Sequence, residues 1–152
     1  MSTALFIGRF QPFHNGHLDA VRQILKENDK IIIAIGSASN TITKKNPYTA
    51  NQRLQMIRAA IGKTKNYEVI LIPDINDPPL WPHYVKRLVG PFDVLYTGSR
   101  FTKECFQKYE KTTPIKSIKK NLKISATQIR NSKHPENFVP KAVAKLLKKW
   151  QA

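Results

Sequence analysis

The sequence is poor in cysteine and has no long apolar run. Cys105 is the only cysteine among 152 residues, which excludes an internal disulfide framework and a clustered-thiolate zinc site. We expect its thiol to be buried and reduced. No apolar run approaches the roughly 20 residues that span a bilayer. The N-terminus lacks the basic and apolar regions of a signal peptide. These absences favour a cytoplasmic protein with no membrane partner.

Acidic side chains are also scarce. The chain has 26 Lys and Arg against 10 Asp and Glu, a net charge of +16, of which residues 1–100 carry +6 and residues 101–152 carry +10. Such a field favours an anionic partner, whether nucleotide, phosphate or nucleic acid. Because no helix-turn-helix, zinc-finger or RNA-recognition signature is present, a nucleic acid is not required.

Short apolar runs alternate with helical patterns along the whole chain. Strands are predicted at residues 3–7, 30–36, 68–72 and 93–98, with a weaker one at 114–118. A helix is predicted after each of the first four strands. These helices cover residues 16–28, about 49–61, 77 to about 90, and a stretch after residue 98 that ends near 109. A last helix is predicted at 140–150. This alternation predicts an α/β fold with a Rossmann-like open parallel sheet, helices on both faces, and one domain over residues 1–152.

Polar loops follow the first four strands at Gly8–His17, Gly36–Asn40, Pro73–Asp77 and Tyr96–Arg100. Ligands of open parallel sheets bind beyond the carboxyl ends of the strands. We therefore expect all four loops to line one site at one edge of the sheet.

The first loop reads GRFQPFHNGH and contains neither Gly-x-Gly-x-x-Gly nor a P-loop. Gly8 permits a sharp turn, and Gly16 permits a ligand to approach a helix start closely. His17 falls in the first helical turn, where exposed N–H groups favour an anion, and His14 faces the same space. Two interpretations stay open: the histidines hold a phosphate chain, or they are turn and cap residues.

A second candidate is KISATQIR near the C-terminus. Its Ser125-x-x-Gln128 spacing predicts a helix cap, as does Thr49-x-x-Gln52 earlier in the chain. Arg130, one turn inside that helix, can bind a phosphate through two N–H groups. The alternative is an ordinary capped helix with a surface arginine.

Together, the His-x-Gly-His loop and the Ser-x-Thr-x-x-Arg motif resemble those of a nucleotidyltransferase superfamily. Within it, GRFQPFHNGHL, IGSAS, NPYTANQR, LW and VPKAV are similar to the archaeal-type nicotinamide-nucleotide adenylyltransferases, and the resemblance runs from Leu5 to about Leu147. It implies transfer of AMP from ATP to nicotinamide mononucleotide, which gives NAD and pyrophosphate. The substrate's own phosphate is then the nucleophile, so no Ser/His/Asp triad is needed. Mg²⁺ would arrive with ATP, held mainly by phosphate oxygens.

The resemblance also implies roles for individual residues. The catalytic residues would be Arg9, His14, His17 and Arg130, all of them toward phosphates. Further ATP-binding residues would be Gly8, Phe10, Gly98, Ser125 and Thr127. The mononucleotide would meet Gly36, Ser37 and Trp81, with Trp81 stacked on the pyridine ring. No residue is expected to be a dedicated metal ligand, and we expect a homo-oligomer.

Two features leave alternatives open. Many relatives have asparagine where this chain has Pro78, so the preference for the amide or the acid mononucleotide stays open. Trp81 is a core residue in the alternative interpretation, although an apolar stripe of Leu80, Tyr84, Val85 and Leu88 is expected to supply the packing of its helix. The rival functions are a pantetheine-phosphate adenylyltransferase or cytidylyltransferase, which usually have threonine at the position of His14, and a basic nucleic-acid-binding module.

Overall fold

The sheet contains five strands, all paired in parallel. The computed structural model describes residues 1–39, 42–63 and 65–151; Asn40, the last residue of the predicted second loop, lies outside them. The strands are β1 (Thr3–Gly8), β2 (Lys30–Ile35), β3 (Tyr67–Leu71), β4 (Val94–Thr97) and β5 (Ile115–Lys116). Their order is β3-β2-β1-β4-β5. The predicted open parallel sheet is confirmed, and its direction of winding reverses between β1 and β4.

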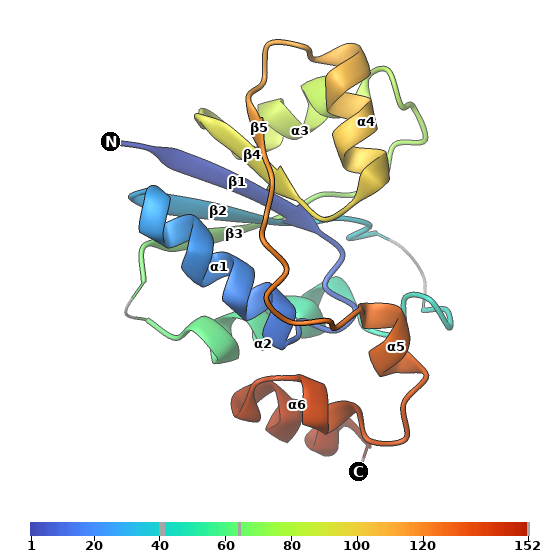
Figure 1. Ribbon diagram of the computed structural model, residues 1–152. Coiled ribbons are helices and arrows are strands. Elements are labelled where there is room, and N and C mark those ends of the chain that lie inside the picture. The colour runs from blue at the N-terminus through green and yellow to red at the C-terminus, as the bar shows by residue number, and fades with distance from the viewer. Residues whose placement is uncertain (40–41, 64, 152) are drawn as a thin grey trace.

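Helices cover both faces of this sheet, as predicted (Figure 1). They are α1 (Asn15–Glu27), α2 (Ala50–Ile61), α3 (Trp81–Val89), α4 (Arg100–Tyr109), α5 (Ala126–Arg130), the 3₁₀ turn η1 (Pro135–Phe138) and α6 (Lys141–Gln151). The apolar sides of α1, α2 and α6 pack in one core cluster, whereas α3 and α4 pack in a second.

Successive residues of β2 belong to opposite cores. Ile31 and Ile33 pack on the side of α1 and α2, and Ile32 and Ala34 pack on the side of α3 and α4. This follows from the two-residue period of a strand, whose side chains alternate between the faces of the sheet. A strand buried on both faces must be apolar throughout, which explains the continuous run in the sequence.

The start of α3 differs from the prediction. A helix with Asp77 as cap and Pro78 as first residue was expected, but α3 begins at Trp81. Residues 78–80 form a turn, in which the Asp77 carboxylate accepts a hydrogen bond from the Leu80 N–H at 3.2 Å. The two consecutive prolines have no N–H to donate, and the turn is closed by the N–H groups of Leu80 and Trp81, which donate to the Asp77 carbonyl at 3.1 and 2.9 Å.

The buried face of α3 also corrects an expectation. Leu80 and Leu88 are 53% and 39% exposed. The residues buried on this helix are Trp81, Pro82, Val85 and Val89, so Val85 is buried as expected, and Trp81, Val85 and Val89 recur every four positions. Trp81 is thus itself part of the packing face.

The segment between β5 and α5 lies across α1 (Figure 1). The Gln23 side chain donates to the Lys119 carbonyl at 2.7 Å and accepts from the Lys119 N–H at 3.2 Å. Asn121 donates to the Asp19 carboxylate at 3.0 Å. These contacts bring a basic segment from the end of the sheet to the start of α5. Among the described residues, no helix is long and apolar enough to cross a membrane.

Candidate active site

A cavity of about 760 Å³ lies at the carboxyl ends of the strands. The loops after β1, β2, β3 and β4 line it, together with the segment from β5 to α5. The expectation that the four loops meet at one edge is confirmed. Every residue predicted for the site lines this cavity: Gly8, Arg9, Phe10, His14, His17, Gly36, Ser37, Trp81, Gly98, Ser125, Thr127 and Arg130. Their roles toward a ligand stay predictions.

His14 and His17 begin helix α1 as a reciprocal cap. His14 Nδ1 accepts hydrogen bonds from the N–H groups of Gly16 and His17 at 3.0 and 3.3 Å. His17 Nδ1 accepts from the His14 N–H at 3.1 Å. The two rings are stacked, with their centroids 3.6 Å apart. The interpretation as cap residues is therefore correct, and it fixes the tautomer, because each ring must carry its proton on Nε2.

Both histidines are held in the neutral form. Burial, with a smaller effect of the Lys120 charge, lowers the pKa of His14 to about 4. Burial and the adjacent His14 lower the pKa of His17 well below 6.5. Two neutral rings, each with one Nε2–H group, can donate hydrogen bonds to phosphate oxygens without the cost of two adjacent buried charges.

At two glycines of the first loop, an added Cβ would come too close to an aromatic ring. A Cβ at Gly16 would lie 2.8 Å from His14 Cε1, and a Cβ at Gly8 would lie 2.9 Å from Phe10 Cζ. Phe10 is buried, with a left-handed φ of 54°, and its ring meets His17 edge to face at 4.8 Å. Gly16 makes room for the imidazole that caps the helix, and because it also lines the cavity, the close approach of a ligand there stays a prediction.

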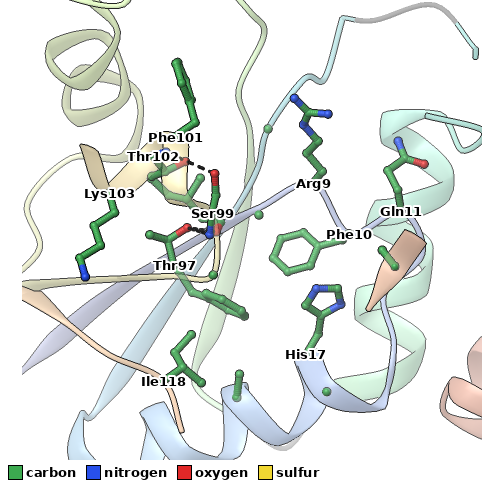
Figure 2. A pocket seen from close by; sticks show the side chains of 18 of the residues that line it. Arg9, Phe10, Gln11, His17, Thr97, Ser99, Phe101, Thr102, Lys103 and Ile118 are labelled. Atoms are coloured by element: carbon green, nitrogen blue, oxygen red, sulfur yellow. Dashed lines mark hydrogen bonds between the residues drawn. The ribbon is translucent and has the colours of Figure 1, made fainter. Parts of the chain in front are cut away.

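Figure 2 shows Arg9, Phe10 and His17 on one side of the cavity, and Thr97, Ser99 and Thr102 on the other. Ser99 caps α4 by accepting from the Thr102 N–H at 3.2 Å. Gly98 lies between β4 and this cap, and a Cβ there would have no atom within 4 Å. The backbone on this side is therefore open to a ligand.

Arg130 reaches the first loop from α5. Ser125 caps α5 by accepting from the Gln128 N–H at 3.1 Å, as predicted. Arg130 donates to the Gln11 carbonyl at 2.9 Å and to the Thr127 hydroxyl at 3.3 Å. Burial and the nearby charge of Arg9 lower the pKa of Arg130. Its guanidinium is therefore fixed in the cavity wall close to a second cation.

No carboxylate within the described residues forms a salt bridge with Arg9 or Arg130. Two neighbouring guanidinium groups without such partners repel each other, and an anion bound between them relieves that repulsion. Among the described ranges, no group of three His, Cys, Asp or Glu side chains could hold a metal ion. The donors at this site thus suit a polyanion rather than a bare cation.

The loops after β2 and β3 form the other end of the cavity. Ser37 is buried, with a left-handed φ of 52°, and its hydroxyl lies 3.4 Å from an Asp74 carboxylate oxygen. Trp81 is 9% exposed and packs against Phe101 and Phe106, each at 5.8 Å between ring centroids. Trp81 therefore both belongs to the core and lines the cavity.

Residues near Pro78 also line the end of the cavity formed by the loops after β2 and β3. Asn76, Asp77 and Pro78 all line the cavity. Cys105 is buried below them, as expected, with its Sγ 3.2 Å from the Pro78 carbonyl.

Arg53 and Gln11 are among the buried polar residues that the sequence interpretation missed. Arg53 on α2 is 2% exposed, and it contacts the loops after β1 and β2. Gln11 is 1% exposed and exchanges two hydrogen bonds of 3.0 Å with the backbone of Tyr48. The signal for Arg53 was its spacing from Met56 and Ile57, three and four residues on, which places it on the apolar face of the helix.

The sheet order, the histidine-capped first helix and the two arginines at the sheet edge agree with the comparisons with known proteins, which show that the chain is a nucleotidyltransferase. The sequence model of the cytidylyltransferase-like family matches residues 5–132. The chain is 38% identical to the nicotinamide-nucleotide adenylyltransferase of Thermococcus onnurineus, over 95% of this chain and 81% of that one. The identity to the enzyme of that name from Picrophilus torridus is 41%, over 95% and 89%. The chain therefore belongs to the nicotinamide-nucleotide adenylyltransferase family.

The fold is also similar to a solved structure from Francisella tularensis, a bifunctional NMN adenylyltransferase/ADP ribose pyrophosphatase complexed with AMP and a manganese ion. The TM-score is 0.73 at 23% identity, over 99% of this chain and 49% of that one. This chain thus spans about half of the bifunctional protein, and the similarity concerns the fold.

Proposed function

We propose that the protein transfers AMP from ATP to nicotinamide mononucleotide, forming NAD and pyrophosphate. The observation that carries this proposal is the placement around one cavity of two neutral Nε2–H donors and two arginines that have no carboxylate partner among the described residues. Membership of the family named for this reaction supports it independently.

The chemistry needs no protein nucleophile. A 5′-phosphate oxygen of the mononucleotide attacks the α-phosphorus of ATP, and the bond from that phosphorus to the α–β bridging oxygen breaks. Pyrophosphate leaves with the electron pair of that bond. The protein contributes positioning and stabilisation of the charge that spreads over the phosphates.

The proposed roles divide the cavity into a phosphate side and a pyridine side. His14, His17 and Arg9 donate to the phosphates around the reacting phosphorus. Arg130, supported by Ser125 and Thr127, holds the leaving β- and γ-phosphates. The backbone at Gly8, Phe10 and Gly98 meets the nucleotide. On the pyridine side, Gly36 and Ser37 face the nicotinamide and Trp81 stacks on its ring; Asn76 or Asp77 replaces the contact that Pro78 cannot make.

The proposal also covers the metal ion, the cellular compartment and the oligomeric state. Mg²⁺ enters with ATP as part of the substrate and is held mainly by phosphate oxygens, which suits a cavity wall formed by cations and N–H donors. A single buried thiol fits a reducing cytoplasm. We also propose a homo-oligomer, on the resemblance to the family alone.

The direct test mixes purified protein with Mg²⁺, ATP and, in separate reactions, nicotinamide mononucleotide, nicotinic acid mononucleotide or phosphopantetheine. Dinucleotide and pyrophosphate are measured together. We expect NAD and pyrophosphate in equal amounts, and little product when Mg²⁺ is chelated. Turnover of phosphopantetheine without turnover of either mononucleotide would overturn the proposal. The variant Arg130→Ala serves as the control for a contaminating activity, because it should lose about 100-fold or more in kcat.

A further inference from the structure

Arg53 is a buried arginine whose hydrogen bonds go to backbone carbonyls. It lies in the first turn of α2 and is 2% exposed. Its Nη1 donates to the carbonyls of Arg9 and Gly36 at 2.9 and 2.8 Å. Its Nη2 donates to the Ser37 carbonyl at 3.1 Å, and its Nε donates to the Thr49 carbonyl at 3.2 Å. One rigid, planar group thus joins the ends of β1 and β2 to the start of α2.

Three of these carbonyls depend on the guanidinium. Among the described residues, the carbonyls of Arg9, Gly36 and Ser37 accept no other hydrogen bond. An apolar residue of similar size at position 53 would leave all three without this donor, and the Ser37 carbonyl would then be a buried acceptor with no partner. Burial and the charge of Arg9 lower the pKa of Arg53 to about 10, although Asp74 acts in the opposite direction. Arg53 therefore stays charged at neutral pH.

The two loops that Arg53 joins belong to different sides of the proposed site. Arg9 belongs to the phosphate side, and Ser37 belongs to the pyridine side. Ser37 also has a left-handed φ of 52°, which a residue other than glycine keeps only when its surroundings impose it. The bond from Arg53 to the Ser37 carbonyl is one such constraint.

We infer that Arg53 is a positioning residue that sets the separation of the two substrates. It touches neither substrate; it holds the backbone of Arg9 and Ser37 so that the attacking phosphate and the α-phosphorus approach in line. This inference rests on the proposed function. It predicts that loss of the guanidinium damages the use of both substrates together, whereas loss of a contact on one side damages one.

The test compares Arg53→Lys with Arg58→Lys, a matched control at an exposed arginine on the same helix. Lysine keeps the charge but not the planar set of donors. At a temperature where both variants are folded by circular dichroism, we expect Arg53→Lys to raise KM for ATP and for the mononucleotide and to lower kcat. A displacement of about 1 Å costs on the order of 100-fold, and we expect a loss of that order in kcat/KM. Arg58→Lys should stay within two-fold of the wild type.

A double-mutant cycle separates positioning from folding. If Arg53 acts through Arg9, then Arg9→Ala should cost less kcat/KM in the Arg53→Lys background than in the wild type, and its cost should be unchanged by Arg58→Lys. Two results would overturn the inference. One is a double variant whose loss in kcat/KM equals the product of the losses of the two single variants. The other is a kcat/KM of Arg53→Lys within two-fold of the wild type. If Arg53→Lys does not fold, Arg53→Gln takes its place, and failure of both to fold would assign the residue to folding alone and overturn it.

The two proposals fail in different ways. A wild type that forms no NAD refutes the proposed function. Calorimetry of ATP binding then tests Arg53 on its own, because weaker binding by Arg53→Lys but not by Arg58→Lys supports the positioning role, and equal binding by both refutes it.

Discussion

His14 and His17 use their two ring nitrogens for different tasks. Each Nδ1 accepts a backbone hydrogen bond at the start of α1, which leaves each Nε2–H available to a ligand. The two interpretations of this loop are therefore compatible: the capping is observed, and the phosphate contact stays a proposal for the other nitrogen. An imidazole separates the two tasks on opposite sides of its ring, whereas a serine or threonine hydroxyl accepts and donates through a single oxygen.

The low pKa of His14 predicts how stability depends on pH. Its pKa is about 4 in the folded protein and near 6.5 in the unfolded chain. Between these values the unfolded chain binds a proton that the folded protein does not, so the free energy of unfolding falls as the pH falls. From pH 7 to pH 5, His14 alone should remove about 2 kcal/mol. His17 shifts in the same direction.

Urea denaturation at pH 7 and pH 5 checks this expectation. The comparison is with His14→Asn, because asparagine keeps a capping acceptor and does not titrate. The wild type should lose about 2 kcal/mol more than the variant over this interval. An equal loss in both proteins would mean that His14 has an ordinary pKa in the folded state.

Trp81 combines packing with its proposed contact to the pyridine ring. Because the side chain is 9% exposed and packs with Val85 and Val89, Trp81→Ala should lower the free energy of unfolding by about 3–5 kcal/mol. Trp81→Phe should lower the free energy of unfolding by less and recover much of the substrate binding.

The effect on substrate binding is a separate expectation, because stacking on a pyridinium contributes roughly 0.5–2 kcal/mol. In both variants, assayed while folded, KM for the mononucleotide should rise, several-fold in the alanine variant, and KM for ATP should stay nearly unchanged. Equal increases for both substrates would make Trp81 a core residue only.

At the scale of elements, the turn into α1 and the end of β4 differ in the space around a glycine. A Cβ at position 16 would meet His14 Cε1 at 2.8 Å, whereas a Cβ at position 98 would meet nothing within 4 Å. Gly16→Ala should therefore displace the His14 ring, and a displacement near 1 Å lowers kcat by on the order of 100-fold. The better helix propensity of alanine offsets part of the lost capping, so we expect little change in melting temperature.

Gly98→Ala is the matched substitution. Its methyl group should project into open space at the nucleotide side, so KM for ATP should rise with an unchanged melting temperature and a kcat close to that of the wild type. Steady-state kinetics and thermal denaturation of the two variants test whether Gly16 positions the His14 ring and Gly98 leaves space for the nucleotide. A large fall in kcat for Gly98→Ala, or normal turnover for Gly16→Ala, would contradict this assignment.

The strands β1, β2 and β4 were predictable because each is a largely apolar run buried on both faces. The edge strands β3 and β5 are only partly buried, and their boundaries were less sharp in the sequence. The start of α3 was not predictable, because Asp77 followed by proline has the pattern of a helix start, whereas residues 78–80 form a turn. The burial of Arg53 was not predictable from the sequence for a different reason. An arginine in a helix is ordinarily solvated, and its partners here are backbone carbonyls, which leave no mark on the side-chain pattern. The clash that excludes a side chain at Gly16 likewise arises from a ring two residues away.

At the scale of the whole molecule, the basic excess is partly directed at the site. Lys116 lines the cavity from the end of β5, and Lys119 and Lys120 line it from the segment between β5 and α5, in the same cavity as Arg9 and Arg130. Hydrogen bonds to Gln23 and Asp19 hold that segment across α1. The acidic side chains Asp74 and Asp77 line the cavity near Ser37 and Trp81. The cavity is thus predominantly basic where the phosphates are proposed to bind, although Asp19 of α1 also lines it there, and it carries Asp74 and Asp77 where the nicotinamide is proposed to bind.

This distribution predicts a salt dependence that belongs to particular lysines. Raising the salt from 0.1 M to 1 M shortens the screening length from about 10 Å to about 3 Å, so kcat/KM for ATP should fall by on the order of 10-fold while kcat changes little. The double variant Lys119→Gln/Lys120→Gln should lower kcat/KM at low salt and flatten this dependence. The control Lys148→Gln/Lys149→Gln removes the same charge from exposed positions on α6, away from the cavity. It should keep the salt dependence of the wild type, whereas equal flattening by both pairs would assign the effect to the net charge of +16.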